Sequence, residues 1–162
     1  MPNGFYCDWL SVAADEARHF GMLQNRLADL GYAYGDFTAH NGLWEMAQKT
    51  ADDVLARMAL VPRVLEARGL DVTPGMILKL RKFDDEQSIA LLEVILEEEV
   101  GHVAIGSNWF RYCCEQRGVE PESTFRELLH KLMKGRIKPP FNGPARLAAG
   151  FSENELAELE RL

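Results

Sequence analysis

The sequence predicts an all-α protein in which several helices pack as a bundle. Apolar residues recur at intervals of three and four positions through most of the 162 residues, which places them on one face of a helix. Gly and Pro concentrate in short connections between these periodic segments, and no segment alternates apolar and polar residues as a half-buried strand does. We therefore expect helices joined by turns and no sheet.

The first helix is expected from about Phe5 to Leu30, where Gly31 ends it. The connection that follows, residues 31–42, is rich in Gly and other turn-forming residues. It contains His40, which we interpret as a surface residue, with support of a nearby site as the alternative.

The second helix is expected from about Leu43 towards Arg68, with a kink at Pro62 because proline cannot donate a backbone hydrogen bond. Residues 69–73 should interrupt it. Thr73 followed by Pro74 is typical of an N-cap and a first helical position, so a helical segment should resume there and continue to about Lys82.

After a turn at residues 83–85, the longest helix is expected from about Glu86 to Arg117, closed by Gly118. A shorter helix should follow Pro121 and end near Gly135. Residues 138–144 contain three prolines and predict an irregular linker, and a capping box at residues 152–155 should open a final short helix. We expect residues 1–135 to form one helical domain, with residues 136–162 as an extension packed on it.

Composition restricts the function. The formal net charge is −7 and 47% of the residues are hydrophobic, which indicates one globular core and disfavours indiscriminate binding to nucleic acid. No apolar run reaches the length that crosses a membrane, and no signal peptide is evident, so we expect a cytoplasmic protein without a membrane partner. The three cysteines are odd in number and suggest reduced packing residues.

A basic strip in the later part of the chain leaves local contact with a tRNA open, although a solvated helix end that balances the helix dipole is the simpler interpretation. The strip consists of Arg126, Lys131, Lys134, Arg136 and Lys138.

Two Glu-x-x-His pairs are the most specific chemical signal in the sequence. They are Glu16 with His19, and Glu99 with His102. Residues three apart lie on one face of a helix, and both pairs fall within apolar stripes, where a carboxylate is costly unless it is paired or coordinated. We interpret them as ligands of a shared metal centre; the alternative is a buried Glu–His pair within each helix.

A third pair with the same spacing, Glu127 and His130, is expected to differ. It lies opposite the apolar stripe of its helix, beside lysines. We interpret it as a solvated contact.

Geometry suggests one more ligand. If the segments on either side of the turn at Phe83 and Asp84 form an antiparallel hairpin, Glu66 lies about as far before the turn as Glu99 lies after it. Glu66 should therefore face Glu99. The alternative is an exposed Glu66 beside Arg63 and Arg68.

Several strings of residues resemble the ferritin-like superfamily of di-metal carboxylate proteins, and more closely a bacterial ferritin-like family known as domain of unknown function 455. These strings are Asp15-Glu16-Ala17-Arg18-His19, Leu65-Glu66-Ala67-Arg68-Gly69, Glu98-Glu99-Val100-Gly101-His102 and residues 140–151. The resemblance implies a ferritin-like, four-helix-bundle type of fold with extra short C-terminal helices. It also implies two iron ions, alternatively manganese, with Glu16 and Glu99 as candidates for bridging. The ligand set would be Glu16, His19, Glu66, Glu99 and His102.

Families related by these motifs include di-iron hydroxylases that act on modified tRNA or on quinone precursors. The resemblance therefore implies an oxygen-dependent, hydroxylase-like oxidoreductase with an unknown small-molecule or tRNA-like substrate. Such proteins carry a further helix, with a sixth ligand, before the first pair. Only 15 residues precede Glu16, so we expect that first core helix to be missing, through an internal start, a shortened chain or a natural truncation.

The alternative function is a non-enzymatic metal-binding or interaction module with an incomplete site. In that case another copy of the chain could cover the apolar groove that the missing helix would leave.

Overall fold

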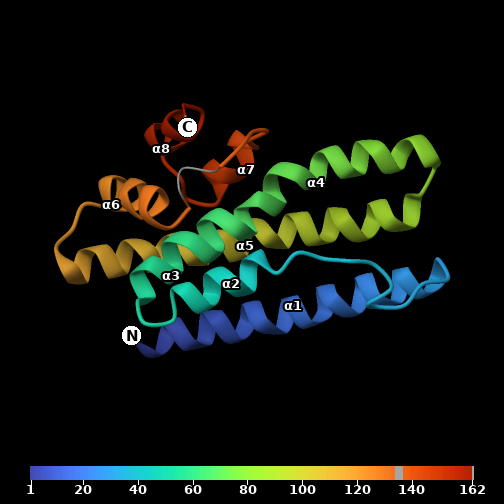
Figure 1. Ribbon diagram of the computed structural model, residues 1–162, viewed down its shortest axis with the longest axis horizontal. Helices are drawn as coiled ribbons and strands as arrows, with labels where there is room; N and C mark the ends of the chain where they lie inside the picture. The colour runs from blue at the N-terminus through green and yellow to red at the C-terminus, as the bar shows by residue number, and fades with distance from the viewer. Residues whose placement is uncertain (134–136, 162) are drawn as a thin grey trace.

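The computed structural model describes residues 1–133 and 137–161, and it confirms an all-α protein (Figure 1). Every regular element in the described part of the chain is helical. The elements are α1 (Asn3–Asp29), α2 (Gly42–Lys49), α3 (Val54–Leu60), η1 (Val61–Glu66), α4 (Ala67–Leu80), η2 (Arg81–Phe83), α5 (Glu86–Arg117), α6 (Pro121–Leu128), η3 (Leu129–Met133), α7 (Gly143–Ala148) and α8 (Glu153–Leu159).

The long helix α5 lies at the centre of the molecule and contacts most of the other elements. It packs against α4 on one side of the turn at η2, against α1, and against α3 and η1. Figure 1 shows α1, α5 and the continuous α3–η1–α4 segment lying side by side, with α6, α7 and α8 gathered at one end. Side chains from α1, η1 and α5 can therefore meet between the helices.

Helices α1 and α5 form where the sequence predicts them, to within two residues. At the start of α5, the side chain of Asp85 accepts a hydrogen bond from the backbone N–H of Ser88. At its end, Gly118 adopts the left-handed conformation (φ 64°) that glycine tolerates best.

The break in the second predicted helix was placed at the wrong residues. The structure interrupts it at residues 50–53, where the Asp53 side chain accepts from the N–H of Leu55 and starts α3. Residues 69–73, predicted as a break, are instead fully helical within α4, and Thr73 is not an N-cap because Pro74 lies inside that helix. Burial of Ala67, Leu70 and Ile77 outweighs the local helix-breaking tendency.

Pro62 produces a wide helical turn rather than a simple kink. It lies in η1, a π-helical segment between α3 and α4. A proline in a helix lacks an N–H and crowds the preceding turn, and the wider turn accommodates both effects. Its ring packs directly on Gly106 of α5, where a Cβ atom would lie only 2.4 Å from two carbons of Pro62. Glycine at position 106 thus allows η1 and α5 to approach closely.

The C-terminal segment contains one helix that the sequence analysis missed. The residues from 137 to Asn142 are irregular as predicted, but Gly143 and Pro144 begin α7, where the Asn142 side chain accepts from the N–H of Ala145. The capping box of Ser152 and Glu155 at the start of α8 is confirmed. The predicted end of the preceding helix near Gly135 lies outside the described residues.

Two buried ion pairs attach α7 and α8 to the rest of the molecule. Arg146 donates two hydrogen bonds to Asp71 of α4, at 2.9 and 2.7 Å. Arg63 of η1 donates to Glu155 at 2.6 Å, and its guanidinium lies over the rings of three phenylalanines. The division at residue 135 into a domain and an extension stays a prediction.

The remaining composition-based expectations concern cysteines and membranes. Cys113 and Cys114 are buried and free, and Cys7 is exposed and free. Among the described residues, no helix is both long and apolar enough to cross a membrane.

Candidate metal centre

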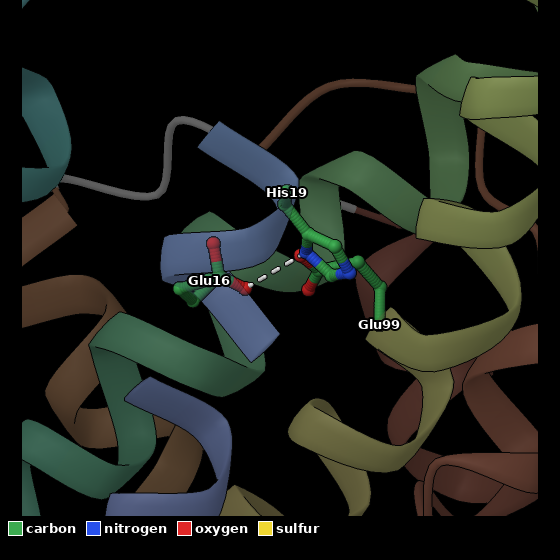
Figure 2. Close-up of side chains that lie close together, drawn as sticks. All are labelled: Glu16, His19 and Glu99. Atoms are coloured by element: carbon green, nitrogen blue, oxygen red, sulfur yellow. Dashed lines mark ion pairs between the residues drawn. The ribbon is translucent and has the colours of Figure 1, made fainter. Parts of the chain in front are cut away.

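The two Glu-x-x-His pairs face each other from α1 and α5. Glu16, His19 and Glu99 each offer a ligand atom, and these atoms all lie within 4.8 Å of one another. Figure 2 shows the three side chains converging, two from α1 and one from α5. The predicted meeting of the two pairs is therefore present in the geometry.

His102 completes the second pair on α5. Its Nδ1 lies 3.1 Å from Oε1 of Glu16 and 3.7 Å from Oε2 of Glu99. The imidazole rings of His102 and His19 are 5.7 Å apart between centroids. Both imidazoles are almost completely buried, so these are core histidines that point at carboxylates and not at solvent.

Glu66 approaches the same cluster from η1. Its carboxyl group is buried, and burial is the main reason that its pKa rises to about 7; the negative charges of Glu99 and Glu16 raise it further. Its Oε2 atom is completely buried. The alternative of an exposed Glu66 is therefore not what the structure shows.

The atoms that would bind metal are those left without partners. Nδ1 of His19, Nδ1 of His102, Oε2 of Glu66 and Oε2 of Glu99 are all buried, and none has a hydrogen-bond partner among the described residues. Buried polar atoms nearly always have a hydrogen-bond partner, so four neighbouring atoms without one need an explanation. A mixed set of carboxylate and imidazole donors fits iron or manganese, and a metal centre would supply partners for such atoms.

Two further carboxylates contact the histidines at Nε2, the ring nitrogen on the side away from the cluster. Oε2 of Glu98 lies 2.6 Å from Nε2 of His19, and Oδ2 of Asp15 lies 3.3 Å from Nε2 of His102. Arg18 joins these carboxylates, since its Nη2 donates to Asp15 at 3.0 Å and to Glu98 at 2.7 Å. A proton on each Nε2 leaves each Nδ1 with a free lone pair directed into the cluster.

The sequence analysis assigned no role to Asp15, Arg18 or Glu98. The available signal is positional, because Asp15 and Glu98 each immediately precede the glutamate of a Glu-x-x-His pair. Each acid then pairs with the histidine of the opposite helix. Spacing within one helix predicts which residues share a face, but it does not predict which side chains contact each other across two helices.

Without a bound cation, protonated histidine compensates the negative charge of the cluster. The carboxylates of Glu16 and then Glu99 raise the pKa of His102 to about 10. The same contact with His102 lowers the pKa of Glu16. Nδ1 of His102 is not well directed at Glu16, so this contact is an ion pair rather than a hydrogen bond. A metal ion would take over the role of that proton.

The cluster is open on one side. The Glu16 side chain is 50% exposed, whereas those of Glu99 and His19 are 15% and 4% exposed. Glu16 therefore lies where a small molecule or another chain could reach the cluster.

The other candidate residues lie away from it. Glu127 and His130 are exposed, in agreement with their interpretation as a solvated pair. His40 is exposed, and its Nδ1 accepts from the N–H of Gly42 at 3.3 Å. In the basic strip, Arg126 is paired with Glu158 and Lys131 and Lys138 are exposed, while Lys134 and Arg136 lie outside the described residues.

Comparisons with known proteins agree on a family but supply no activity. A family model described as "Protein of unknown function (DUF455)" matches residues 1–157. A Haemophilus influenzae protein described as "Uncharacterized protein" is 49% identical over 152 residues, which cover 94% of this chain and 53% of that protein. The chain thus spans about half the length of this relative. No solved structure matches the chain.

Proposed function

Because the chain belongs to the DUF455 family, whose description supplies no activity, we propose from its own side chains that it binds two iron ions, alternatively manganese, between α1, η1 and α5. Its ligands would be Glu16, His19, Glu66, Glu99 and His102. We further propose that the helices form a ferritin-like bundle and that the protein is an oxidoreductase of the hydroxylase-like class. Its substrate is unknown.

One observation carries this proposal. Four buried ligand atoms, from α1, η1 and α5, have no hydrogen-bond partner among the described residues. A purely structural Glu–His cluster would join these atoms by well-directed hydrogen bonds, as Asp15 and Glu98 contact the outer nitrogens. The Nδ1 atoms instead contact Glu16 and Glu99 only as ion pairs, at 3.1 to 3.9 Å.

In the proposed reaction the metal ions and the side chains of the chain would have different roles. A pair of iron ions, when bound, would supply electrons to dioxygen. Glu16 and Glu99 would hold the ions together with the histidines, because each lies near both imidazoles. Glu66 would bind after losing its proton, which its raised pKa retains near neutral pH in the metal-free protein. Asp15 and Glu98 would hold the imidazoles so that Nδ1 stays directed at the metal.

The alternative is a metal-binding or interaction module without catalysis. Two features favour it: the site has five ligands where carboxylate centres in helical bundles commonly use six, and Glu16 is half exposed. A protein of this kind would bind metal without reacting with oxygen.

Metal analysis tests the proposal. The full chain is loaded anaerobically with Fe²⁺, freed of excess metal and analysed for iron. We expect two ions per chain, with loss of binding in the Glu16→Ala/Glu99→Ala double variant. The matched control is Glu127→Ala/His130→Ala, which removes a pair of the same spacing from the surface. Less than one ion per chain, unchanged by the first double variant, would overturn the proposal.

Exposure of the loaded protein to oxygen separates the two functions. An optical change that requires both iron and oxygen supports an oxidoreductase. Two bound ions with no such change would support the non-enzymatic alternative.

A further inference from the structure

A pocket of about 340 Å³ lies beside the N-terminal half of α1. Its walls are mostly apolar and include Phe5, Trp9, Val54, Met58 and Val61. The volume is at the lower end of the range of about 300–1,000 Å³ that is common for small-molecule sites. None of the five proposed metal ligands lines it. Figure 1 shows the N-terminal end of α1 close to α2 and α3.

A positive charge lies in the wall of this apolar pocket. Arg57 donates through Nε to the hydroxyl of Thr50 at 2.7 Å and through Nη2 to the carbonyl of Ala47. Both acceptors are neutral, and among the described residues no carboxylate forms an ion pair with Arg57. The contacts fix the guanidinium in place without balancing its charge, so an anion beside it would be stabilised.

A second donor at the pocket is also unsatisfied. The indole N–H of Trp9 is buried and has no acceptor in the described part of the chain. Trp109 offers a comparison, since its indole N–H donates to Asp8 at 2.8 Å. A buried donor left unpaired costs free energy, which a ligand acceptor would recover if the indole ring turned its N–H towards the pocket.

From these features we propose that the pocket binds a small amphiphilic carboxylate. Its apolar part would lie against Phe5, Trp9 and Met58, and its carboxylate would bind Arg57. The apolar walls supply burial, and the uncompensated guanidinium selects the anion over a neutral molecule of the same size.

The position of the pocket connects it with the metal centre. Trp9 and Glu16 are seven residues apart on α1, which places them on the same face and about 10 Å apart along the helix axis. Val61 and Glu66 are the first and last residues of η1, about one π turn apart. That the carboxylate is a substrate of the metal centre rests on the proposed function. That the pocket binds the carboxylate does not rest on it.

Binding of octanoate to the metal-free full chain tests the pocket, with octanol as a neutral molecule of equal chain length. Calorimetric titration of the wild-type protein should show saturable 1:1 binding of octanoate and weaker binding of octanol. Arg57→Gln should weaken octanoate binding about tenfold or more, because it removes a charge-assisted contact. Ala51→Trp, at an exposed position that lines the pocket, should block both ligands.

Matched variants control for indirect effects. Arg81→Gln removes an exposed arginine elsewhere, and should leave octanoate binding unchanged. Trp9→Phe keeps an aromatic ring but removes the indole N–H, and should weaken binding, whereas Trp44→Phe at the exposed surface should not. Circular dichroism confirms that each variant is folded.

Two results would overturn the proposal. Equal affinity of the wild-type protein for octanoate and octanol would show an apolar pocket without anion recognition, and this comparison needs no variant. Absence of saturable octanoate binding would exclude the ligand class. Because these titrations use metal-free protein, a failure of the chain to bind iron would not alter them, so the two proposals fail separately.

Discussion

At the scale of single residues, the proposed metal centre would depend on pairs of side chains and not on individual ligands. His19 and His102 are useful ligands only if the proton is on Nε2, and Glu98 and Asp15 favour that tautomer from the opposite helix. Arg18 keeps both carboxylates charged and in place. Asp15 and Glu98 are thus each adjacent in sequence to the glutamate of one Glu-x-x-His pair, but each contacts the histidine of the other pair.

Glu98→Gln should weaken metal binding about 10- to 100-fold, because it removes the charge that orients His19. Competition with a chromophoric chelator measures the change. Glu97→Gln, one residue earlier on the exposed side of α5, should bind metal as the wild-type protein does. Equal affinities of the two variants would show that Glu98 has no orienting role.

Glu66→Gln should change how the stability of the metal-free protein depends on pH. The pKa of Glu66 is about 7 in the folded chain, against an ordinary value of 4.5. Between these values only the unfolded chain loses the proton, so the contribution of Glu66 falls as pH rises, by roughly 3 kcal/mol at most. Glutamine abolishes this contribution.

Urea unfolding with a chelator present, at pH 5 and pH 7.5, measures the effect. The stability of Glu66→Gln relative to the wild type should be greater at the higher pH. A constant difference between the two proteins would contradict the raised pKa.

At the scale of elements, the sequence was sufficient for α1 and α5 but not for the helix between them. Both long helices combine a continuous apolar stripe with a clear end, Gly31 after α1 and Gly118 after α5. The α3–η1–α4 segment contains Pro62, Gly69 and Pro74, which oppose a helix locally, and its packing on α5 decides the outcome. Packing partners are not visible in a single sequence.

The same comparison bears on the predicted position of Glu66. The number of residues from the turn at Phe83 predicts which residues of the two helices lie at the same height only if both helices are continuous. The predicted break at residues 69–73 would have shifted that register. Because α4 is continuous, Glu66 remains near enough to Glu99 for that charge to raise its pKa. Its role as a ligand, like that of the other four residues, stays a prediction.

Gly106→Ala should destabilise the protein by about 1–3 kcal/mol, because the new methyl group would overlap the ring of Pro62. Gly101→Ala, on the same helix, meets nothing within 4 Å and should stabilise the protein by about 0.5–1 kcal/mol, since alanine favours a helix. Urea unfolding of both variants gives the two free energies. Equal effects of the same sign would contradict the close contact between η1 and α5.

At the scale of the whole molecule, two buried ion pairs connect residues that are 75 and 92 positions apart in sequence. Asp71 and Arg146 are almost completely buried, as are Arg63 and Glu155. These contacts were not predicted, because Asp71 was expected in a break and α7 was not expected at all. A long-range pair of this kind leaves no periodic signal in the sequence.

Asp71→Ala and Arg146→Ala should each destabilise the protein by about 3–5 kcal/mol, because each leaves a buried charge without its partner. The double variant should lose less than the sum of the two, since neither charge then remains. Arg81 and Glu93 form the control pair: both are more than half exposed, and removal of either should cost about 1 kcal/mol or less. Additive losses at positions 71 and 146 would contradict direct coupling.

The crossed pairing of the acids and histidines also has a mechanical consequence. Asp15 of α1 contacts His102 of α5, and Glu98 of α5 contacts His19 of α1, so two polar contacts connect the two helices. A shift of one helix along the other by a single residue, about 1.5 Å, would disturb both contacts. The donor atoms are consequently held at fixed separations in the metal-free chain, so in the proposed metal centre ions would enter, leave or exchange without refolding of the chain.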